Sequence, residues 1–200
     1  MRIAIFSDVH GNLIALEKFI SMTRSLVESY ICLGDVVDYG PWNDECLERI
    51  HDLPGIIYLQ GNHERLFLGV DDIEDEIPLV QSFFRKSYSN FSRFDLINVL
   101  PESIDRFNFR FQHTINNQYI YPDTKINIDR NYIVGHSHYQ YSTSHGGFKV
   151  INPGSVGINK KCINKINYII LDTEINKIEY FTITYNFDLF ISELYARHYD

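Results

Sequence analysis

The first 60 residues alternate short apolar runs with amphipathic stretches, and this alternation restricts the possible folds more than any other feature. Apolar runs of strand length occupy residues 2–7, 30–33 and 55–60. Between them, residues 12–22 and 43–53 carry apolar side chains at helical spacing. A strand–helix–strand–helix–strand order predicts parallel strands joined by helical crossovers, and therefore an α/β fold.

The remaining 140 residues continue as irregular helices and then as strands. Residues 66–100 have helical periodicity with an acidic stretch that suits a solvated turn or helix start. Further strands are expected at 106–113, 131–138, 148–152, 166–173 and 178–185, with a final helix at 187–199. The sequence contains neither a repeat nor a linker, so residues 1–200 are expected to form one domain.

The charge balance restricts the possible partners. The formal net charge is −8 and the isoelectric point is near 5.4, which opposes binding to an extended nucleic acid duplex. A small phosphorylated substrate remains compatible with this charge, because bound metal ions would supply the positive charge. The sequence leaves the oligomeric state open.

Three widely spaced cysteines indicate reduced thiols rather than a disulfide framework: Cys32, Cys46 and Cys162. The N-terminal segment has one basic residue and only a short apolar run, so neither a signal peptide nor a membrane span is expected. Both observations favour the cytoplasm, without a membrane partner.

Polar side chains gather where the expected strands end. They are Asp8, His10, Asp35, Asn62, His63, His113, His136 and His138. Each of them alone also fits a structural role, such as a helix cap, a turn residue or a hydrogen-bonded histidine. Together they supply oxygen and imidazole ligands in the number that two divalent ions require, and ligand sites of α/β sheets lie beyond the carboxyl ends of the strands.

In order along the chain, the polar segments read SDVHG, GDVV, GNHE, FQHT and GHSH. This series resembles the ordered motifs of the calcineurin-like metallophosphoesterases, from residue 5 to about residue 157. The later NPGSVG segment, the expected hairpin and the terminal helix resemble the compact single-domain branch of bacteria and archaea. The resemblance implies a four-layer α/β/β/α sandwich of mixed sheets.

The resemblance also implies a site with two divalent metal ions. One ion would be held by Asp8, His10 and His138. The other would be held by Asn62, His113 and His136, with Asp35 bridging both. Mixed oxygen and imidazole ligands suit manganese, which is the expected metal, and iron, zinc or nickel are the alternatives.

The resemblance further implies a reaction. A hydroxide held between the ions would attack phosphorus, because two divalent cations lower the pKa of bound water and neutralise phosphoryl charge. His63 corresponds to the family histidine that faces the substrate without binding metal. It would protonate or stabilise the leaving oxygen. The alternative is that His63 only supports the ligand loop.

The expected function is hydrolysis of small phosphorylated compounds. Phosphodiesters are slightly favoured, because the chain resembles the compact branch of the family. Tyr39 stands where the protein-phosphatase branch has an arginine that helps bind phosphate, which ranks a protein phosphatase below a small-molecule esterase. The alternatives are a phosphomonoesterase or protein phosphatase, a hydrolase of dinucleoside polyphosphates, and a non-catalytic scaffold. The scaffold alternative is opposed by the metal-site histidines, which a retromer subunit of the family has lost and this chain retains.

Three residues near these motifs have open roles. Asp38 is not a family ligand and is expected to support its loop by hydrogen bonding. Trp42 would either stack on a substrate or pack against the helix at 43–53. Lys160, in a lysine-rich segment, would either bind a polyphosphate or lie in solvent.

Overall fold

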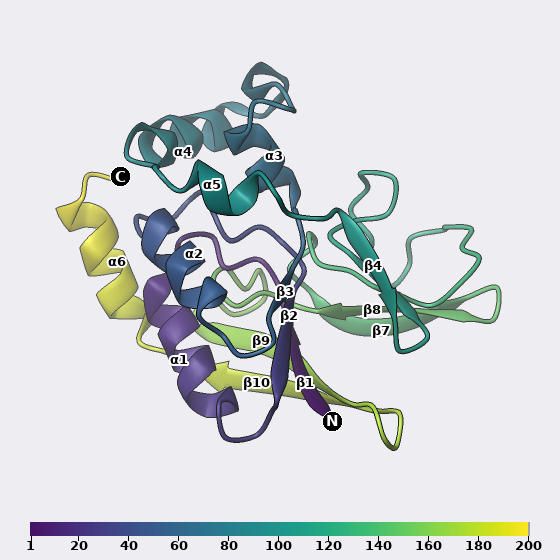
Figure 1. Ribbon diagram of the computed structural model, residues 1–200. Helices are drawn as coiled ribbons and strands as arrows, with labels where there is room; N and C mark the ends of the chain where they lie inside the picture. The colour runs from purple at the N-terminus through teal and green to yellow at the C-terminus, as the bar shows by residue number, and fades with distance from the viewer. Residues whose placement is uncertain (200) are drawn as a thin grey trace.

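The computed structural model describes residues 1–199, which form two five-stranded sheets packed face to face (Figure 1). The first sheet has the order β10-β9-β1-β2-β3. Its strands are β1 (Arg2–Phe6), β2 (Ser29–Cys32), β3 (Ile57–Tyr58), β9 (Lys165–Asp172) and β10 (Lys177–Thr184). The second sheet has the order β4-β5-β6-β8-β7. Its strands are β4 (Ser103–Arg106), β5 (Phe109–Gln112), β6 (Tyr132–Ile133), β7 (Gln140–His145) and β8 (Phe148–Pro153).

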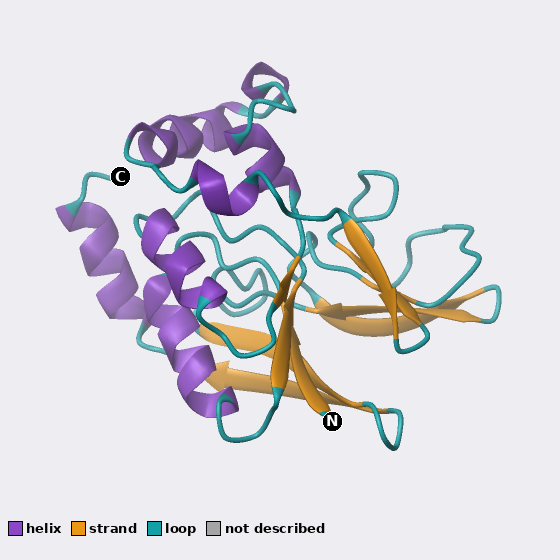
Figure 2. Ribbon diagram, viewed as in Figure 1, coloured by secondary structure: helices purple, strands orange, loops and turns teal. Residues whose placement is uncertain are grey.

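The helices lie on one side of this pair of sheets (Figure 2). They are α1 (Leu13–Thr23), α2 (Asn43–His51), α3 (Asn62–Phe67), the short 3₁₀ turn η1 (Ile73–Asp75), α4 (Pro78–Ser89), α5 (Phe94–Ile97) and α6 (Phe187–Ala196). Within residues 1–199, none of them combines the length and the apolar character that crossing a membrane requires.

The predicted strand–helix alternation at the start of the chain is confirmed. β1 pairs in parallel with β2, and β2 pairs in parallel with β3. α1 begins after Asn12, whose side chain accepts a hydrogen bond from the Ala15 N–H at 3.1 Å. The hairpin of β9 and β10 and the terminal helix α6 also form where the sequence predicts them.

The prediction of one strand over residues 106–113 is wrong. The chain turns at Phe107 and Asn108, so that β4 and β5 form an antiparallel hairpin. Both turn residues have positive φ, 51° and 62°, as the tight turns favoured between twisted strands require. The sequence also gave no sign of β7, a largely polar strand at the edge of the second sheet.

Three apolar clusters hold the layers together. Ile5, Ile31 and Phe111 belong to the cluster between the sheets, and Phe19 belongs to the cluster between the first sheet and the helices. The outer face of the second sheet is covered by residues 114–131, which run as irregular backbone. The predicted α/β fold with two mixed sheets is confirmed. The layer over the second sheet is irregular backbone, where the expected α/β/β/α sandwich would have helices.

The parallel strands bring their carboxyl ends to one edge of the molecule. Asp8 follows β1, Asp35 follows β2 and Asn62 follows β3. From the second sheet, His113 directly follows β5 and His136 follows β6. Loops from both sheets therefore meet at one place, which is where α/β folds bind their ligands.

Candidate metal centre

The eight residues predicted for the site lie together at this edge. Three groups each place their ligating atoms within 4.8 Å of one another: Asp8 with His10 and His138, His10 with Asp35 and His63, and Asp35 with His113 and His136. Asn62 lines a cavity together with His113. The shared members His10 and Asp35 make the three groups one continuous cluster.

Local backbone strain shapes the loops of this cluster. Positive φ angles, between 50° and 66°, occur at Asp8, His10, Asp35, His136 and His138. Such conformations cost of order 1–3 kcal/mol each for residues other than glycine, and they persist where the surrounding structure enforces them. Gly135 also lies so close to the residue before Asp8 that an added Cβ would be 2.1 Å from Ser7 Oγ. These strained backbone conformations direct the polar side chains into the cluster.

Three histidines are oriented by hydrogen bonds to backbone carbonyls. The Nδ1 atoms of His10, His113 and His138 lie 3.2, 3.0 and 2.7 Å from the carbonyl oxygens of Val37, Leu33 and Ile158. A carbonyl only accepts, so Nδ1 of each ring carries a proton. In neutral His10 and His138, Nε2 then has a free lone pair. This is the orientation in which metal-binding histidines are usually held. Burial lowers the pKa of His113, but Asp35 raises it by more, to about 9.

The inward lone pairs of His10 and His138 face one another. Their Nε2 atoms are 3.2 Å apart, and His138 Nε2 is 3.4 Å from Asp8 Oδ1. Burial lowers the pKa of both histidines, which favours neutral rings. Two lone pairs and a carboxylate oxygen therefore converge on one volume, an arrangement that a cation stabilises.

Asp35 lies at the centre of the other half of the cluster. Its Oδ2 is 2.9 Å from His113 Nε2, and its Oδ1 accepts a hydrogen bond from the His63 backbone N–H at 3.0 Å. Burial raises the pKa of Asp35, but His113 and His63 lower it by more, to well below its ordinary value. Asp35 is thus a buried carboxylate that stays ionised.

Buried polar atoms that lack a hydrogen-bond partner indicate whether metal ions fit the cluster. Among the described residues, Asp8 Oδ2 and Asn62 Oδ1 are buried and have no hydrogen-bond partner. Leaving such an atom unsatisfied costs about 1–3 kcal/mol. Carboxylate, amide and imidazole donors are ligands for divalent first-row metals, so the residues present fit two such ions.

His63 is held by Asp38, and this contact gives both residues a role. His63 Nδ1 donates to Asp38 Oδ2 at 2.8 Å, while Asp38 Oδ1 accepts from the Tyr39 N–H at 2.7 Å. Burial lowers the pKa of His63, but Asp35 and Asp38 raise it by more, to about 9. The loop-supporting role expected for Asp38 is therefore present, together with a contact to His63 that the sequence did not reveal.

Glu64 is an important residue that the sequence analysis left without a role. Its buried carboxylate binds the backbone of two ligand loops. It accepts hydrogen bonds, at 2.7–2.9 Å, from the N–H groups of Asp35, Val36 and Gly61 and from the Tyr58 hydroxyl. The available signal was its position, three residues into a helix that begins after Gly61.

Aromatic rings surround the cluster on two sides. The Tyr39 ring lies 4.8 Å from His10 and 4.9 Å from His63, measured between ring centroids. On the other side, Tyr119 stacks on His136 at 3.9 Å, and Lys160 Nζ lies 5.2 Å from the Tyr119 centroid. Lys160 thus stands beside the rim of the centre.

Trp42 does not take part in the rim. It is 9% exposed and packs against Phe190 of α6, with the Arg197 guanidinium 5.3 Å from its ring. The packing alternative is therefore correct: Trp42 lies in one buried cluster with Cys46 and Leu47 of α2, and its ring also contacts α6.

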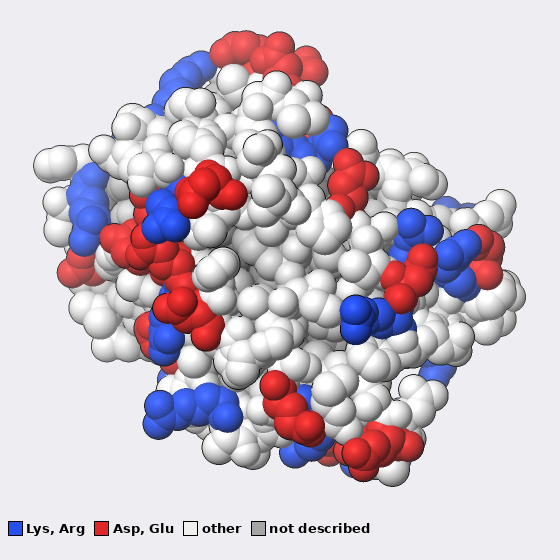
Figure 3. All heavy atoms as spheres, viewed as in Figure 1, with Lys and Arg blue, Asp and Glu red and all other residues white. Residues whose placement is uncertain are grey.

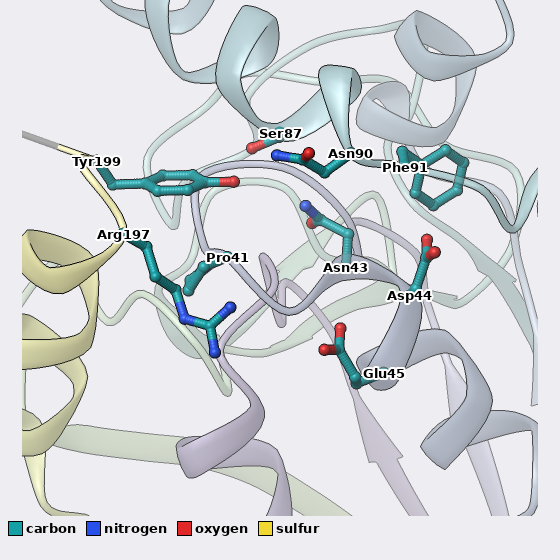
Figure 4. A pocket seen from close by; sticks show the side chains of 9 residues that line it. All are labelled: Pro41, Asn43, Asp44, Glu45, Ser87, Asn90, Phe91, Arg197 and Tyr199. Carbon is teal, nitrogen blue, oxygen red and sulfur yellow. The ribbon is translucent and has the colours of Figure 1, made fainter.

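A second cavity, of about 410 Å³, lies apart from the cluster (Figure 4). Tyr199 reaches into it from the C-terminal segment, and Asn43 faces it from the first turn of α2. Of the described residues, none of the eight predicted for the site lines it.

Basic and acidic side chains are interspersed on the surface drawn in Figure 3, and acidic side chains gather over the loop between α3 and α4.

Comparison with known proteins identifies a family that covers most of the chain. The sequence model of the calcineurin-like phosphoesterase superfamily domain matches residues 1–176. An uncharacterized protein of Methanocaldococcus jannaschii is 29% identical over 214 aligned positions, which cover 92% of this chain and 88% of the relative.

Two solved structures have the same fold as this chain. A metallophosphoesterase from Sphaerobacter thermophilus has a TM-score of 0.80 at 22% identity, with 98% of this chain and 94% of that chain covered. A hypothetical protein from Pyrococcus horikoshii has a TM-score of 0.82 at 17% identity, with coverages of 100% and 94%. At these identities the likeness concerns the fold.

Proposed function

Because the chain belongs to the calcineurin-like phosphoesterase superfamily and is a phosphoric ester hydrolase, we propose that it hydrolyses small phosphorylated compounds with two divalent metal ions. The family is metal-dependent. The observation that carries the proposal is the convergence of unprotonated His10 and His138 Nε2 atoms, 3.2 Å apart, beside Asp8. Facing lone pairs repel one another, and a cation bound between them removes this repulsion.

We assign the ligands as the motifs suggest. Asp8, His10 and His138 would hold one ion, Asn62, His113 and His136 would hold the other, and Asp35 would serve both. Bound ions supply an activated water and neutralise charge on the phosphoryl oxygens. The mixed donor set of oxygen and imidazole ligands, without thiolates, suits manganese, with iron, zinc or nickel as alternatives.

The protein contributes the proton for the leaving group. Asp38 fixes the His63 ring through Nδ1, which leaves Nε2 directed toward the cluster, 3.9 Å from Asp35 Oδ2. A protonated His63 donates from Nε2 to the leaving oxygen, as a positioned general acid does. Tyr39 and Tyr119 cover the sides of the centre and limit the access of bulk water.

Phosphodiesters are the preferred substrates in this proposal. Tyr39 places a neutral phenol, with its pKa raised by burial, beside His10 and His63. A dianionic monoester would gain from a fixed cation at that position, whereas a monoanionic diester needs it less. The alternatives are phosphomonoesters, phosphoproteins and dinucleoside polyphosphates. The three free cysteines support a reducing, cytoplasmic location.

A substrate comparison tests the proposal. Purified protein is assayed with bis(p-nitrophenyl) phosphate, p-nitrophenyl phosphate and a dinucleoside polyphosphate after metal removal and reloading with Mn²⁺, Fe²⁺, Zn²⁺ or Ni²⁺. We expect hydrolysis only with metal, and the highest kcat/KM for the diester with Mn²⁺. Hydrolysis at full rate without metal would refute the proposal, and absence of hydrolysis with every metal would favour the scaffold alternative.

A further inference from the structure

The cavity next to Asn62 and His113 extends beyond the proposed metal ligands. It has a volume of about 310 Å³ and is also lined by Arg65, Arg110 and Glu102. We call it the arginine cavity. It connects the proposed ligands for one ion with two guanidinium groups, so a substrate bound at the metals has room to extend toward them.

The two arginines differ in their partners. Arg65 forms two hydrogen bonds with Asp71, at 2.7 and 2.8 Å, and lies 3.4 Å from Glu102. Its charge is therefore compensated within the protein. Arg110 donates from Nη2 to Ser103 Oγ at 2.9 Å, and no carboxylate of residues 1–199 forms an ion pair with it.

Strand alternation directs Arg110 into the arginine cavity. Its neighbours Phe109 and Phe111 on β5 point into the core between the sheets, so Arg110 points to the opposite face. Its Nε is buried and has no hydrogen-bond partner among the described residues. Asp105, directly opposite on β4, forms its ion pair with Arg130 instead. A partly buried guanidinium without an ion-pair partner is costly, and an anionic ligand would remove that cost.

We infer that Arg110 binds a second anionic group of the substrate, a phosphoryl group separate from the one that is hydrolysed. Planar guanidinium groups match phosphate oxygens through paired N–H donors. The preferred substrates are then phosphodiesters or polyphosphates that carry a further phosphoryl group. This inference rests on the proposed function and adds a specificity-determining residue to it.

Two matched substrates test the inference. Both are p-nitrophenyl esters of thymidine 5′-phosphate, and one carries an additional phosphate on the 3′-oxygen. Reacting phosphorus and leaving group are identical, so the ratio of the two kcat/KM values isolates the second phosphate. We expect wild-type protein to prefer the 3′-phosphorylated diester by about tenfold or more, as a charge-assisted hydrogen bond provides.

The variant Arg110→Gln should reduce this ratio to about one, and Arg110→Lys should leave an intermediate ratio because a single ammonium replaces the planar fork. The control Arg106→Gln changes an exposed arginine on neighbouring β4 and should keep the wild-type ratio. A ratio is unaffected by a smaller folded fraction. An unchanged ratio in Arg110→Gln overturns the inference while the proposed function stands.

Calorimetry with thymidine 3′,5′-bisphosphate distinguishes a failure of the proposed function from a failure of the inference about Arg110. If neither diester is hydrolysed, the proposed function fails, and the affinity for the bisphosphate still decides the role of Arg110. We expect Arg110→Gln to weaken that affinity by about tenfold relative to wild type and to Arg106→Gln. Equal affinities in all three proteins overturn the inference.

Discussion

Protons and cations compete for the same small volume between His10 and His138. Their Nδ1 atoms are committed to backbone carbonyls, so each ring offers only a lone pair to the other at 3.2 Å. Asp8 adds a carboxylate to the same volume, with one oxygen that lacks a hydrogen-bond partner in the described chain. Individual hydrogen bonds therefore prepare these residues for a cation.

At the residue scale, His63 provides a prediction about leaving groups. His63→Gln should reduce hydrolysis of esters with poor leaving groups by about 100-fold or more, because general acid catalysis contributes about 10² to 10⁴. Esters of p-nitrophenol, whose leaving group needs little protonation, should lose about tenfold or less. The measurement is kcat/KM across a series of aryl and alkyl esters.

The matched control for His63 is His51→Gln, an exposed histidine at the end of α2. It should leave the whole series unchanged. An equal loss for good and poor leaving groups in His63→Gln would show that this histidine only positions the loop.

At the scale of helices and strands, the loops that bear the proposed ligands are held in position by neighbouring elements. Glu64, on the first turn of α3, joins the loop after β2 to the loop after β3 through backbone N–H groups. Charged acceptors make hydrogen bonds of about 1.5–3 kcal/mol. The position of Asp35 thus depends on a carboxylate that does not itself contact the proposed ions.

Glu64→Gln should lower the free energy of unfolding by about 2–3 kcal/mol, because an amide cannot accept at both positions. Urea denaturation of metal-free protein measures this effect. The control Glu45→Gln replaces an exposed glutamate on α2 and should change stability by less than about 0.5 kcal/mol. Equal stability of Glu64→Gln and wild type would contradict the loop-joining role.

At this same scale, hydrophobic periodicity and short motifs were enough to predict several helices and strands and the location of the site. The parallel strands, α1 and the clustering of the eight polar residues followed from strand ends and helical spacing. The β4–β5 hairpin was missed because its turn uses Phe107 and Asn108 instead of a glycine pair. The role of Glu64 and the contact of Asp38 with His63 were missed because they depend on partners that only the folded chain brings together.

For the whole molecule, the site depends on the packing of two sheets. β1, β2 and β3 of the first sheet and β5 and β6 of the second deliver ligands to one edge, and the apolar cluster between the sheets fixes their distance. Neither sheet alone contains the complete set of proposed ligands. The organisation of residues 1–200 as one domain stays a prediction.

Metal removal should therefore destabilise the protein as a whole. At free metal about 100 times Kd, binding to the folded state adds about 2.7 kcal/mol, or about 5–10 °C in Tm for a chain of this size. A thermal melt with EDTA should show this loss, and EDTA saturated with Mn²⁺ is the control. An identical Tm in both conditions would contradict a metal site within the fold.

The central claim, two divalent ions bridged by Asp35, is tested most directly by metal analysis of three proteins. Inductively coupled plasma mass spectrometry should find two divalent ions per chain in the wild type and fewer than one in Asp35→Asn. The neighbouring variant Asp38→Asn, which changes no proposed ligand, should retain two. Two ions per chain in Asp35→Asn, with hydrolysis preserved, would contradict the account.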